Sequence, residues 1–202
     1  MTMIKSVRYF TVVAVLLLAT LASIRAPAAS QGQDLLFHNP ATPRLGAADA
    51  KLTLVVFTDY NCPYCKRLDP LLEQIVSRYP QVAVAIKILP FKGESAHRAA
   101  QLALTLWRQQ PERFLALHRT LMSKRGYHSA GSLQEALQRS GNGSLQPDGP
   151  GSIQELRDTL MLAQALGVEG TPTMIIGNQL IPGALEYEQL EQAVQAALAQ
   201  QP

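Results

Sequence analysis

Residues 52–65 read LTLVVFTDYNCPYC, and this stretch decides the fold class of the chain. Its first seven residues are mostly apolar and rich in β-branched side chains, which predicts a buried strand over Leu52–Thr58. The only two cysteines of the chain, Cys62 and Cys65, follow after a short turn. Pro63 fits the first position of a helix, so Cys62 is predicted to be the residue that caps the helix N-terminus.

A C-x-x-C pair at the start of a helix indicates redox chemistry. The unsatisfied backbone N–H groups and the helix dipole favour the thiolate of Cys62 over its thiol. Cys65 lies one turn further into the helix, where it can attack a mixed disulfide formed at Cys62. A purely structural disulfide is disfavoured, because closing a two-residue loop constrains little of the unfolded chain. A metal site at the two thiols is the remaining alternative.

The N-terminus has the layout of a secretory signal peptide. Lys5 and Arg8 precede an apolar run over 9–22, and an A-x-A cleavage pattern ends at Ala28. The apolar run is short for a membrane span, although an uncleaved anchor is an alternative. We therefore expect residues 1–28 to be removed. The mature protein would then work in an oxidising compartment, for which the bacterial periplasm is the best candidate.

Charge and length limit the possible functions. The chain has 18 basic and 15 acidic residues. Residues 1–28 hold three of the basic residues and none of the acidic ones, so the remainder carries 15 of each. No long basic stretch with interleaved aromatic residues is present, so nucleic-acid binding has no support. The part after residue 28 is long enough for one domain with a full core.

Hydrophobic periodicity predicts the order of the remaining elements. A helix from Cys62 that ends at Pro80 and a strand over Val82–Leu89 follow the first strand. Four helices come next: one over 95–110, one from Pro111, and two that start at capping boxes at Ser132 and Ser152. The chain then forms strands over Thr173–Ile176 and Gln179–Ile181 around a Gly177-Asn178 turn, and it closes with a helix over 187–199. This order predicts an α/β, thioredoxin-like fold. A helical insertion at about 92–167 separates the βαβ half from the ββα half.

The predicted boundaries follow from this order. Residues 1–28 are the signal peptide, 29–51 are a lead-in segment that could add an edge strand, and 52–202 are the thioredoxin-like domain. Residues 140–151 are rich in Gly, Ser, Asn and Pro, so they are interpreted as a surface loop and not as a domain boundary.

Two motifs carry a resemblance to a known family. FTDYNCPYCK at 57–66 and GTPT at 170–173 resemble the DsbA-type branch of the thioredoxin superfamily. Within that branch, these motifs and LTLWR at 104–108 are most similar to the ScsC group (suppressor of copper sensitivity protein C). The resemblance covers the chain from near Leu36 to the last helix. It implies a DsbA-like fold and a redox-active Cys62–Cys65 disulfide without another cofactor.

The resemblance also implies which residues surround the dithiol. The bond between Thr171 and Pro172 would be cis, in a loop that lies against the dithiol and offers backbone groups to a substrate. Thr171 would tune how the substrate or the thiolate is held. Together with Pro63 and Tyr64, these residues would form the substrate-binding part of the active-site loop.

Asp69 and Lys87 match family positions that hold charged residues beneath the dithiol. There they would support proton transfer at Cys65. In the oxidases of the family an acidic residue lies six positions before the first cysteine, and here that position is Val56. This difference puts a complete buried charge network in doubt. An exposed Asp69 and a snorkelling Lys87 are the alternative.

Other polar side chains near these motifs have simpler interpretations. His97 and His118 fall on apolar helix faces, where packed or surface imidazoles are expected. Lys66 and Arg67 follow the dithiol and either lower the pKa of Cys62 further or are solvated helix charges.

The sequence thus predicts a periplasmic thiol–disulfide oxidoreductase that exchanges disulfides with protein substrates. The ScsC resemblance implies a membrane-bound, DsbD-like reductant and a reductase or isomerase role in copper-stress tolerance, whereas resemblance to DsbA itself implies net oxidation. The lead-in segment is too short for a dimerisation domain, so we expect a monomer. The alternative is a periplasmic copper-binding protein that uses Cys62 and Cys65 as ligands, because thiolates suit Cu(I).

Overall fold

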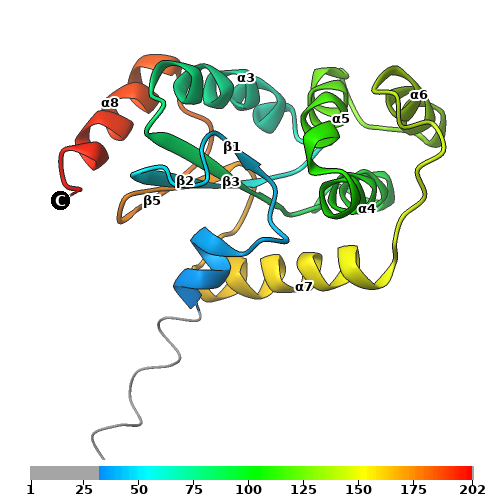
Figure 1. Ribbon diagram of the computed structural model, residues 1–202, viewed down its shortest axis with the longest axis horizontal. Helices are drawn as coiled ribbons and strands as arrows, with labels where there is room; N and C mark the ends of the chain where they lie inside the picture. The colour runs from blue at the N-terminus through cyan, green and yellow to red at the C-terminus, as the bar shows by residue number, and fades with distance from the viewer. Residues whose placement is uncertain (1–31, 202) are drawn as a thin grey trace, which may run out of the picture. The chain divides into compact units, whose positions relative to one another are not determined.

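The computed structural model of the protein describes residues 32–201 (Figure 1). The predicted signal peptide, residues 1–28, lies outside the described residues. From Leu36 onward the chain forms one compact unit. Within residues 32–201, no helix has the length and apolar character that a membrane span requires.

A five-stranded mixed sheet forms the centre of this unit, in the order β1-β3-β2-β4-β5. The strands are β1 (Arg44–Leu45), β2 (Leu52–Thr58), β3 (Val82–Ile88), β4 (Thr173–Ile176) and β5 (Gln179–Pro182). Strands β2 and β3 are parallel, and the other neighbouring strands pair antiparallel. The lead-in segment does supply an edge strand. Its apolar patch at 35–37, however, lies in the short π-helix η1 (Asp34–His38).

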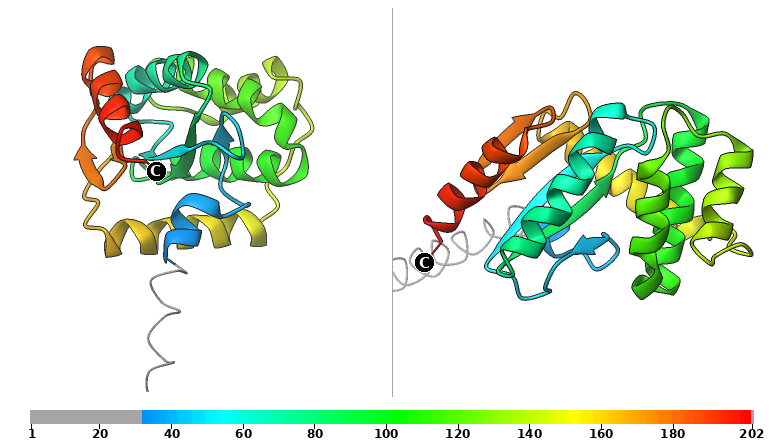
Figure 2. Two further views of the ribbon diagram at one scale, coloured as in Figure 1. Left: turned by 60° about the vertical axis from the view of Figure 1, so that its left-hand side comes forward. Right: turned by 90° about the horizontal axis from the view of Figure 1, so that it is seen from above.

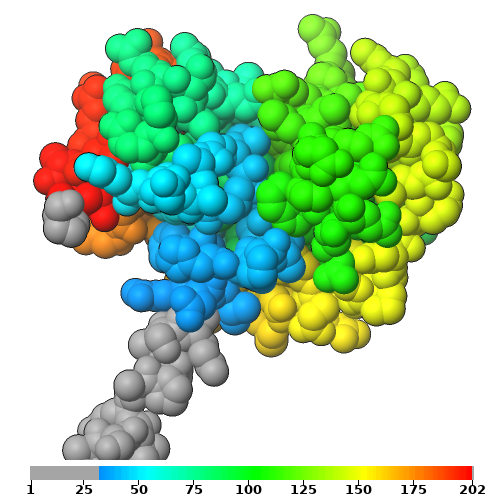
Figure 3. Space-filling model, in the orientation of Figure 1, coloured from blue at the N-terminus to red at the C-terminus, as the bar shows by residue number. Residues whose placement is uncertain are grey.

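Six α-helices of the described residues surround the sheet. They are α3 (Pro63–Arg78), α4 (Glu94–Gln109), α5 (Pro111–Ser123), α6 (Ala130–Arg139), α7 (Pro150–Ala165) and α8 (Tyr187–Leu198). Helices α3 and α8 cover one face of the sheet and α7 lies across the other (Figures 1 and 2). Helices α4, α5 and α6 pack together beside the sheet, and Figure 3 shows their green-to-yellow surface directly against the blue and cyan segments. The predicted thioredoxin-like fold with a helical insertion is confirmed.

Side chains of β2 point alternately into two apolar clusters. Leu54 and Val56 join the larger cluster, which includes residues of α3 and α8, whereas Val55 and Phe57 join a smaller cluster with Ala163 of α7. Because both faces of the strand are covered, six of the seven residues of β2 are buried, and five of these six are apolar. This arrangement explains the continuous apolar run that precedes the cysteines.

Both predicted capping boxes are wrong in position. Helix α6 begins at Ala130, because Ser129 is its N-cap and exchanges hydrogen bonds with Ser132. Helix α7 begins at Pro150, and the Asp148 carboxylate accepts a hydrogen bond from the backbone N–H of Ser152. In both places a polar residue further upstream satisfies the helix N-terminus first. The helices therefore start two residues before the predicted caps.

Candidate active site

The dithiol lies at the start of α3, as the sequence predicts. Cys62 is the N-cap residue, with extended backbone angles (φ −82°, ψ 120°), and Pro63 occupies the first helical turn. Cys62 and Cys65 are both free thiols, and each side chain is 1% exposed. The two sulfur atoms therefore belong to one small, largely dry site that opens beside Tyr64, whose side chain is 55% exposed.

The two thiols ionise very differently. The pKa of Cys62 is lowered to about 5, mainly by hydrogen bonding from the Cys65 side chain; the backbone N–H groups of Cys65 and Tyr64 act in the same direction, and burial opposes them. Burial raises the pKa of Cys65 well above its ordinary value, and the adjacent Cys62 raises it further. At neutral pH the pair therefore holds a Cys62 thiolate and a Cys65 thiol, which is the arrangement of a nucleophile and a resolving cysteine.

The loop before β4 covers the Cys62 sulfur from the other side. The bond between Thr171 and Pro172 is cis, which confirms that prediction. The Cys62 thiol donates a hydrogen bond of 3.2 Å to the carbonyl oxygen of Thr171. The Thr171 hydroxyl is buried and has no hydrogen-bond partner among the described residues. It is therefore available to donate to a Cys62 thiolate or to a substrate sulfur held there.

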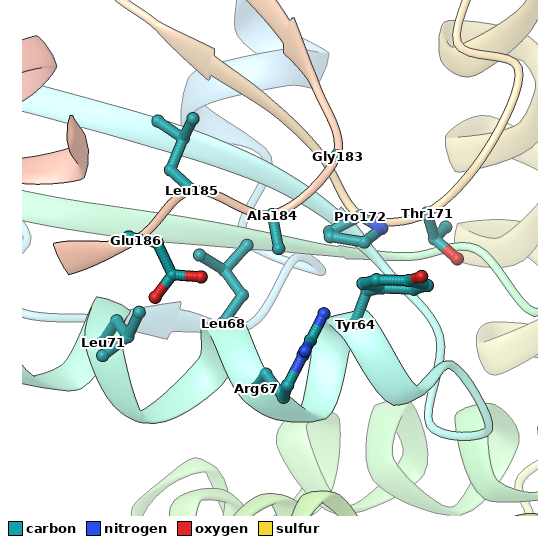
Figure 4. Close-up of a pocket in the computed structure, with 10 residues that line it drawn as sticks. All are labelled: Tyr64, Arg67, Leu68, Leu71, Thr171, Pro172, Gly183, Ala184, Leu185 and Glu186. Carbon is teal, nitrogen blue, oxygen red and sulfur yellow. The ribbon is translucent and has the colours of Figure 1, made fainter.

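A groove of about 470 Å³ begins at this loop and runs along α3 (Figure 4). Its lining residues are Tyr64, Arg67, Leu68, Leu71, Thr171, Pro172, Gly183, Ala184, Leu185 and Glu186. The Arg67 guanidinium lies 4.7 Å from the centre of the Tyr64 ring, and this ring faces Pro172 in Figure 4. A lining that mixes apolar side chains with polar backbone, one cation and one anion suits an extended peptide whose reactive sulfur lies next to Cys62.

The turn that presents Cys62 is fixed by two buried polar side chains. Asp59 accepts hydrogen bonds from the backbone N–H groups of Asn61 and Lys92, at 2.6 and 2.8 Å. Asn61 donates to the carbonyl oxygen of Lys92 and to the Ser95 hydroxyl, and it accepts from the backbone N–H of His128. The helical insertion therefore holds the active-site turn in place, and neither residue was singled out from the sequence.

Asp69 is buried, 7% exposed, and it belongs to a cluster that we call the Asp69 cluster: Asp69, His118 and Tyr60. Its carboxylate oxygen lies 2.7 Å from Nε2 of His118, and Nδ1 of the same ring lies 2.9 Å from the Tyr60 hydroxyl. Tyr60 precedes Cys62 by two residues, and Asp69 follows Cys65 by one helical turn. The predicted alternative of an exposed Asp69 is wrong, and His118 is a packed imidazole with two partners.

Lys87 is fully buried in a second cluster, the Glu155 cluster, which comprises Lys87, Glu155 and Thr42. Its ammonium group lies 3.2 Å from the Glu155 carboxylate and donates to the Thr42 hydroxyl. The Thr42 hydroxyl donates to Glu155 at 2.6 Å, and the amide of Asn39 donates to the other carboxylate oxygen at 2.8 Å. Burial lowers the pKa of Lys87, and the charge of Glu155 opposes that shift.

The structure does not bring Asp69 and Lys87 together. Lys87 alternates along β3 with residues of the larger apolar cluster and so faces α7, whereas Asp69 lies on α3. Among the described residues, neither side chain forms a hydrogen bond with Cys65, so their support of proton transfer stays a prediction. A buried carboxylate does pair with Lys87, although Val56 replaces the acidic residue of the family. Glu155 supplies it from α7.

Sequence reasoning missed Glu155 because it sits at the acidic position of an apparent capping box. The better signal was the spacing of Ser152, Glu155, Thr159 and Ala163, which are all buried along one face of α7. Leu160, an apolar residue of the same helix, is by contrast 40% exposed. A helix face of small residues with one acid therefore packs against the sheet opposite Lys87.

Lys66 and Arg67 both have specific contacts in the structure. The ammonium group of Lys66 donates to the carbonyl oxygens of Lys124 and Gly126, at 2.6 and 2.7 Å. Arg67 lies over Tyr64.

Within residues 32–201, no group of three or more His, Cys, Asp or Glu side chains is arranged to hold a metal ion.

Known proteins match both the sequence and the structure. Residues 53–195 match the family model of the DSBA-like thioredoxin domain. A periplasmic thioredoxin-like protein from Salmonella enterica serovar Typhimurium is 54% identical, with a TM-score of 0.81 over 84% of this chain and 97% of that chain. The catalytic domain of Proteus mirabilis ScsC is 47% identical, with a TM-score of 0.82 over 85% of this chain and 97% of that chain. Disulfide bond formation protein D of Bacillus subtilis (strain 168) is 25% identical over 185 residues, 83% of each chain.

Proposed function

Because the chain belongs to the family of DSBA-like thioredoxin domains, we propose that it works in the periplasm and exchanges disulfides with proteins through Cys62 and Cys65. It is a thiol–disulfide oxidoreductase of the DsbA and ScsC type. The single observation that carries the proposal is the placement of two free thiols at the start of α3, with Cys62 as the N-cap residue against the cis Thr171–Pro172 loop and Cys65 one turn behind it. The Salmonella relative is described as periplasmic, which supports the compartment.

In the reducing direction, the Cys62 thiolate attacks a sulfur atom of a substrate disulfide. A bond forms between Cys62 and that sulfur, the substrate S–S bond breaks, and the second substrate sulfur leaves as a thiolate. The thiol of Cys65 then loses its proton and attacks the Cys62 sulfur. This step forms the Cys62–Cys65 disulfide and releases the second reduced cysteine, so two electrons pass from the protein to the substrate. Oxidation of a substrate follows the same steps in reverse.

The surroundings of the Cys62 sulfur suit a mixed disulfide. When Cys62 is protonated, its S–H donates to the carbonyl oxygen of Thr171, and the groove of Figure 4 leads away from the same loop. An extended substrate segment would lie between Tyr64 and Pro172, with backbone groups of the loop available for hydrogen bonding. The Thr171 hydroxyl would gain its missing partner there.

We propose that the protein reduces or isomerises substrate disulfides and acts in copper-stress tolerance, as its likeness to ScsC suggests. A DsbD-like membrane reductant would supply the electrons. A thiolate with a pKa of about 5 stabilises the reduced form. The expected reduction potential therefore lies between about −120 mV, as in DsbA, and about −270 mV, as in thioredoxin. We further propose that the mature protein is a monomer, which light scattering on the purified protein would test.

The decisive experiment measures the Cys62–Cys65 couple in glutathione buffers together with two variants. Cys62→Ser should abolish exchange with a peptide disulfide, because no second thiolate is exposed. Cys65→Ser should still react once but should accumulate mixed disulfides, visible on a non-reducing gel. Full exchange activity in Cys62→Ser, or the absence of any reversible couple in the wild type, would refute the oxidoreductase mechanism.

Copper binding is tested with the same proteins. Two soft thiols on adjacent turns would be the ligands for Cu(I), and the low pKa of Cys62 makes one of them available as thiolate at neutral pH. Copper analysis of the reduced wild type beside Cys62→Ser and Cys65→Ser would show whether binding depends on the thiols. Thiol-dependent, stoichiometric copper without exchange activity would support copper binding as the sole role.

A further inference from the structure

A second groove, of about 350 Å³, lies beside the start of α3. Asn61 and Pro63, the two chain neighbours of Cys62, line it. The other lining residues are Lys66 and Arg67 of α3 and residues 122–127, which follow from the end of α5. We call this feature the basic groove. Because both chain neighbours of Cys62 line it, a segment bound there would lie close to Cys62.

The basic groove is positively charged and has apolar parts. Its four charged lining residues are all cations: Lys66, Arg67, Lys124 and Arg125. Within the part of the chain that the structure describes, none of the four forms an ion pair. Pro63, Met122 and the ring of Tyr127, which is 59% exposed, supply apolar surface. The rest of the chain after residue 28 has no excess of positive charge, so this concentration is local.

Hydrogen bonds hold the groove open before any ligand arrives. The ammonium group of Lys66 bonds the carbonyl oxygens of Lys124 and Gly126, and that of Lys124 bonds those of Arg125 and Tyr127. These bonds fix the loop against α3 but leave the positive charges without carboxylate partners. Burial and the nearby Lys124 lower the pKa of Lys66, as expected for cations gathered together.

We propose that the basic groove binds an acidic segment of the protein substrate, next to the cysteine that reacts at Cys62. This inference rests on the proposed function and adds the chemistry of the preferred substrate. Carboxylates would meet the four cations, and an apolar or aromatic side chain would pack on Tyr127 and Pro63. A basic segment at the same place would be repelled, so the groove selects by charge and speeds encounter.

The test uses three peptides, each with one cysteine in a mixed disulfide with thionitrobenzoate. The cysteine is flanked on one side by three Glu, three Gln or three Lys residues. Stopped-flow absorbance follows the release of thionitrobenzoate by the reduced protein. Each rate is divided by the rate with 2-mercaptoethanol, which removes the intrinsic reactivity of the peptide.

At low ionic strength, the normalised rate should be about tenfold higher for the Glu peptide than for the Lys peptide. In about 0.5 M salt the difference should nearly vanish, because the charges are screened. The double variant Lys124→Gln, Arg125→Gln should reduce the preference to about twofold, and Arg125→Glu alone should reduce it as well. Arg157→Gln, an exposed arginine of α7, is the matched control and should keep the full preference. Lys66 is left intact because its bonds join the loop to α3, and Arg125→Glu alone keeps the bonds of the Lys124 ammonium group as well.

Each possible result has a separate meaning. Equal normalised rates for the three peptides, or a preference that survives Arg125→Glu and the double variant, would overturn the inference while leaving the oxidoreductase function intact. Failure of the Gln peptide to react with Cys62 would instead refute the proposed function. The same variants can also be compared in a second reaction, in which the soluble domain of a DsbD-like reductant reduces the Cys62–Cys65 disulfide. If the groove charges change only the rate of that reaction, the inference is overturned, because the groove would then bind the reductant and not the substrate.

Discussion

The Asp69 cluster and the Glu155 cluster are both buried and charged, but they connect different parts of the molecule. The Asp69 cluster joins α3 to α5 and ends at Tyr60, two residues before Cys62. The Glu155 cluster lies on the α7 side of the sheet and joins β3, α7 and the lead-in segment. We infer that the first cluster acts on the dithiol and that the second holds three distant segments together.

The partners of the two carboxylates support this distinction. Glu155 accepts from Thr42, Asn39 and Lys87, so all of its bonds tie it to other chain segments. Among residues 32–201, Asp69 has one hydrogen-bonded partner, the His118 ring, which is itself bonded to a tyrosine hydroxyl. A carboxylate–imidazole–phenol chain can hold or pass a proton, whereas a saturated ion pair cannot easily do so.

Glu155→Gln is the change with the largest expected effect. It leaves the Lys87 ammonium group buried without its counter-charge, so the free energy of unfolding should fall by about 3–5 kcal/mol. Urea denaturation of the oxidised protein would measure the loss. Glu135→Gln, which removes an exposed pair with Arg139, is the control and should cost less than about 1 kcal/mol. A loss for Glu155→Gln no larger than this would contradict a structural role of the pair.

Asp69→Asn should act mainly on the redox reaction. The amide keeps a hydrogen-bonding partner for His118, so the free energy of unfolding should fall by only about 1–3 kcal/mol. If the cluster takes up the proton of Cys65, release of the mixed disulfide should slow by about tenfold or more. Quenched-flow analysis of the mixed disulfide would measure that step. An unchanged release rate in Asp69→Asn, or an equal slowing in Glu155→Gln, would remove the distinction between the clusters.

Tyr60→Phe is a milder test of the same chain of hydrogen bonds. It removes the hydroxyl bonded to His118 but keeps the buried ring, so we expect a loss of about 1 kcal/mol in the free energy of unfolding. Release of the mixed disulfide should slow less than in Asp69→Asn, because the carboxylate and imidazole remain. Denaturation and quenched-flow measurements on the two variants in parallel would rank them, and the opposite order would contradict the proposed chain.

Glu155→Gln should have no effect on the ionisation of Cys62, which a pH titration of the reduced protein would follow. The thiolate absorbance of Cys62 near 240 nm should appear with a midpoint at about pH 5 in the wild type, and the midpoint should be unchanged in Glu155→Gln. Because this pKa is lowered from 9.0, ionisation of Cys62 stabilises the reduced fold. That stabilisation is fully present above about pH 9 and is lost as the pH falls through about 5. A shifted midpoint in Glu155→Gln would mean that the Glu155 cluster also acts on the dithiol.

Much of the fold follows from short-range signals in the sequence. The strand, turn and Pro63 that place Cys62 at a helix N-terminus lie within fourteen consecutive residues. The β4–β5 hairpin follows from Gly177, whose φ is +61°, a left-handed backbone value that glycine adopts readily. Such features depend on neighbouring residues, so a single sequence contains what is needed to predict them. Helix starts were less certain because several polar residues compete to cap one N-terminus.

The sequence by itself determined the dithiol, its helix and the order of strands and helices, because local backbone preferences and hydrophobic period set them. Only the tertiary structure decided that His118 meets Asp69, that Glu155 meets Lys87 and that residues 122–127 add cations beside Cys62. These side chains are 49 and 68 residues apart in the two pairs. A buried polar group must find a partner wherever packing places one, and no local pattern contains that information.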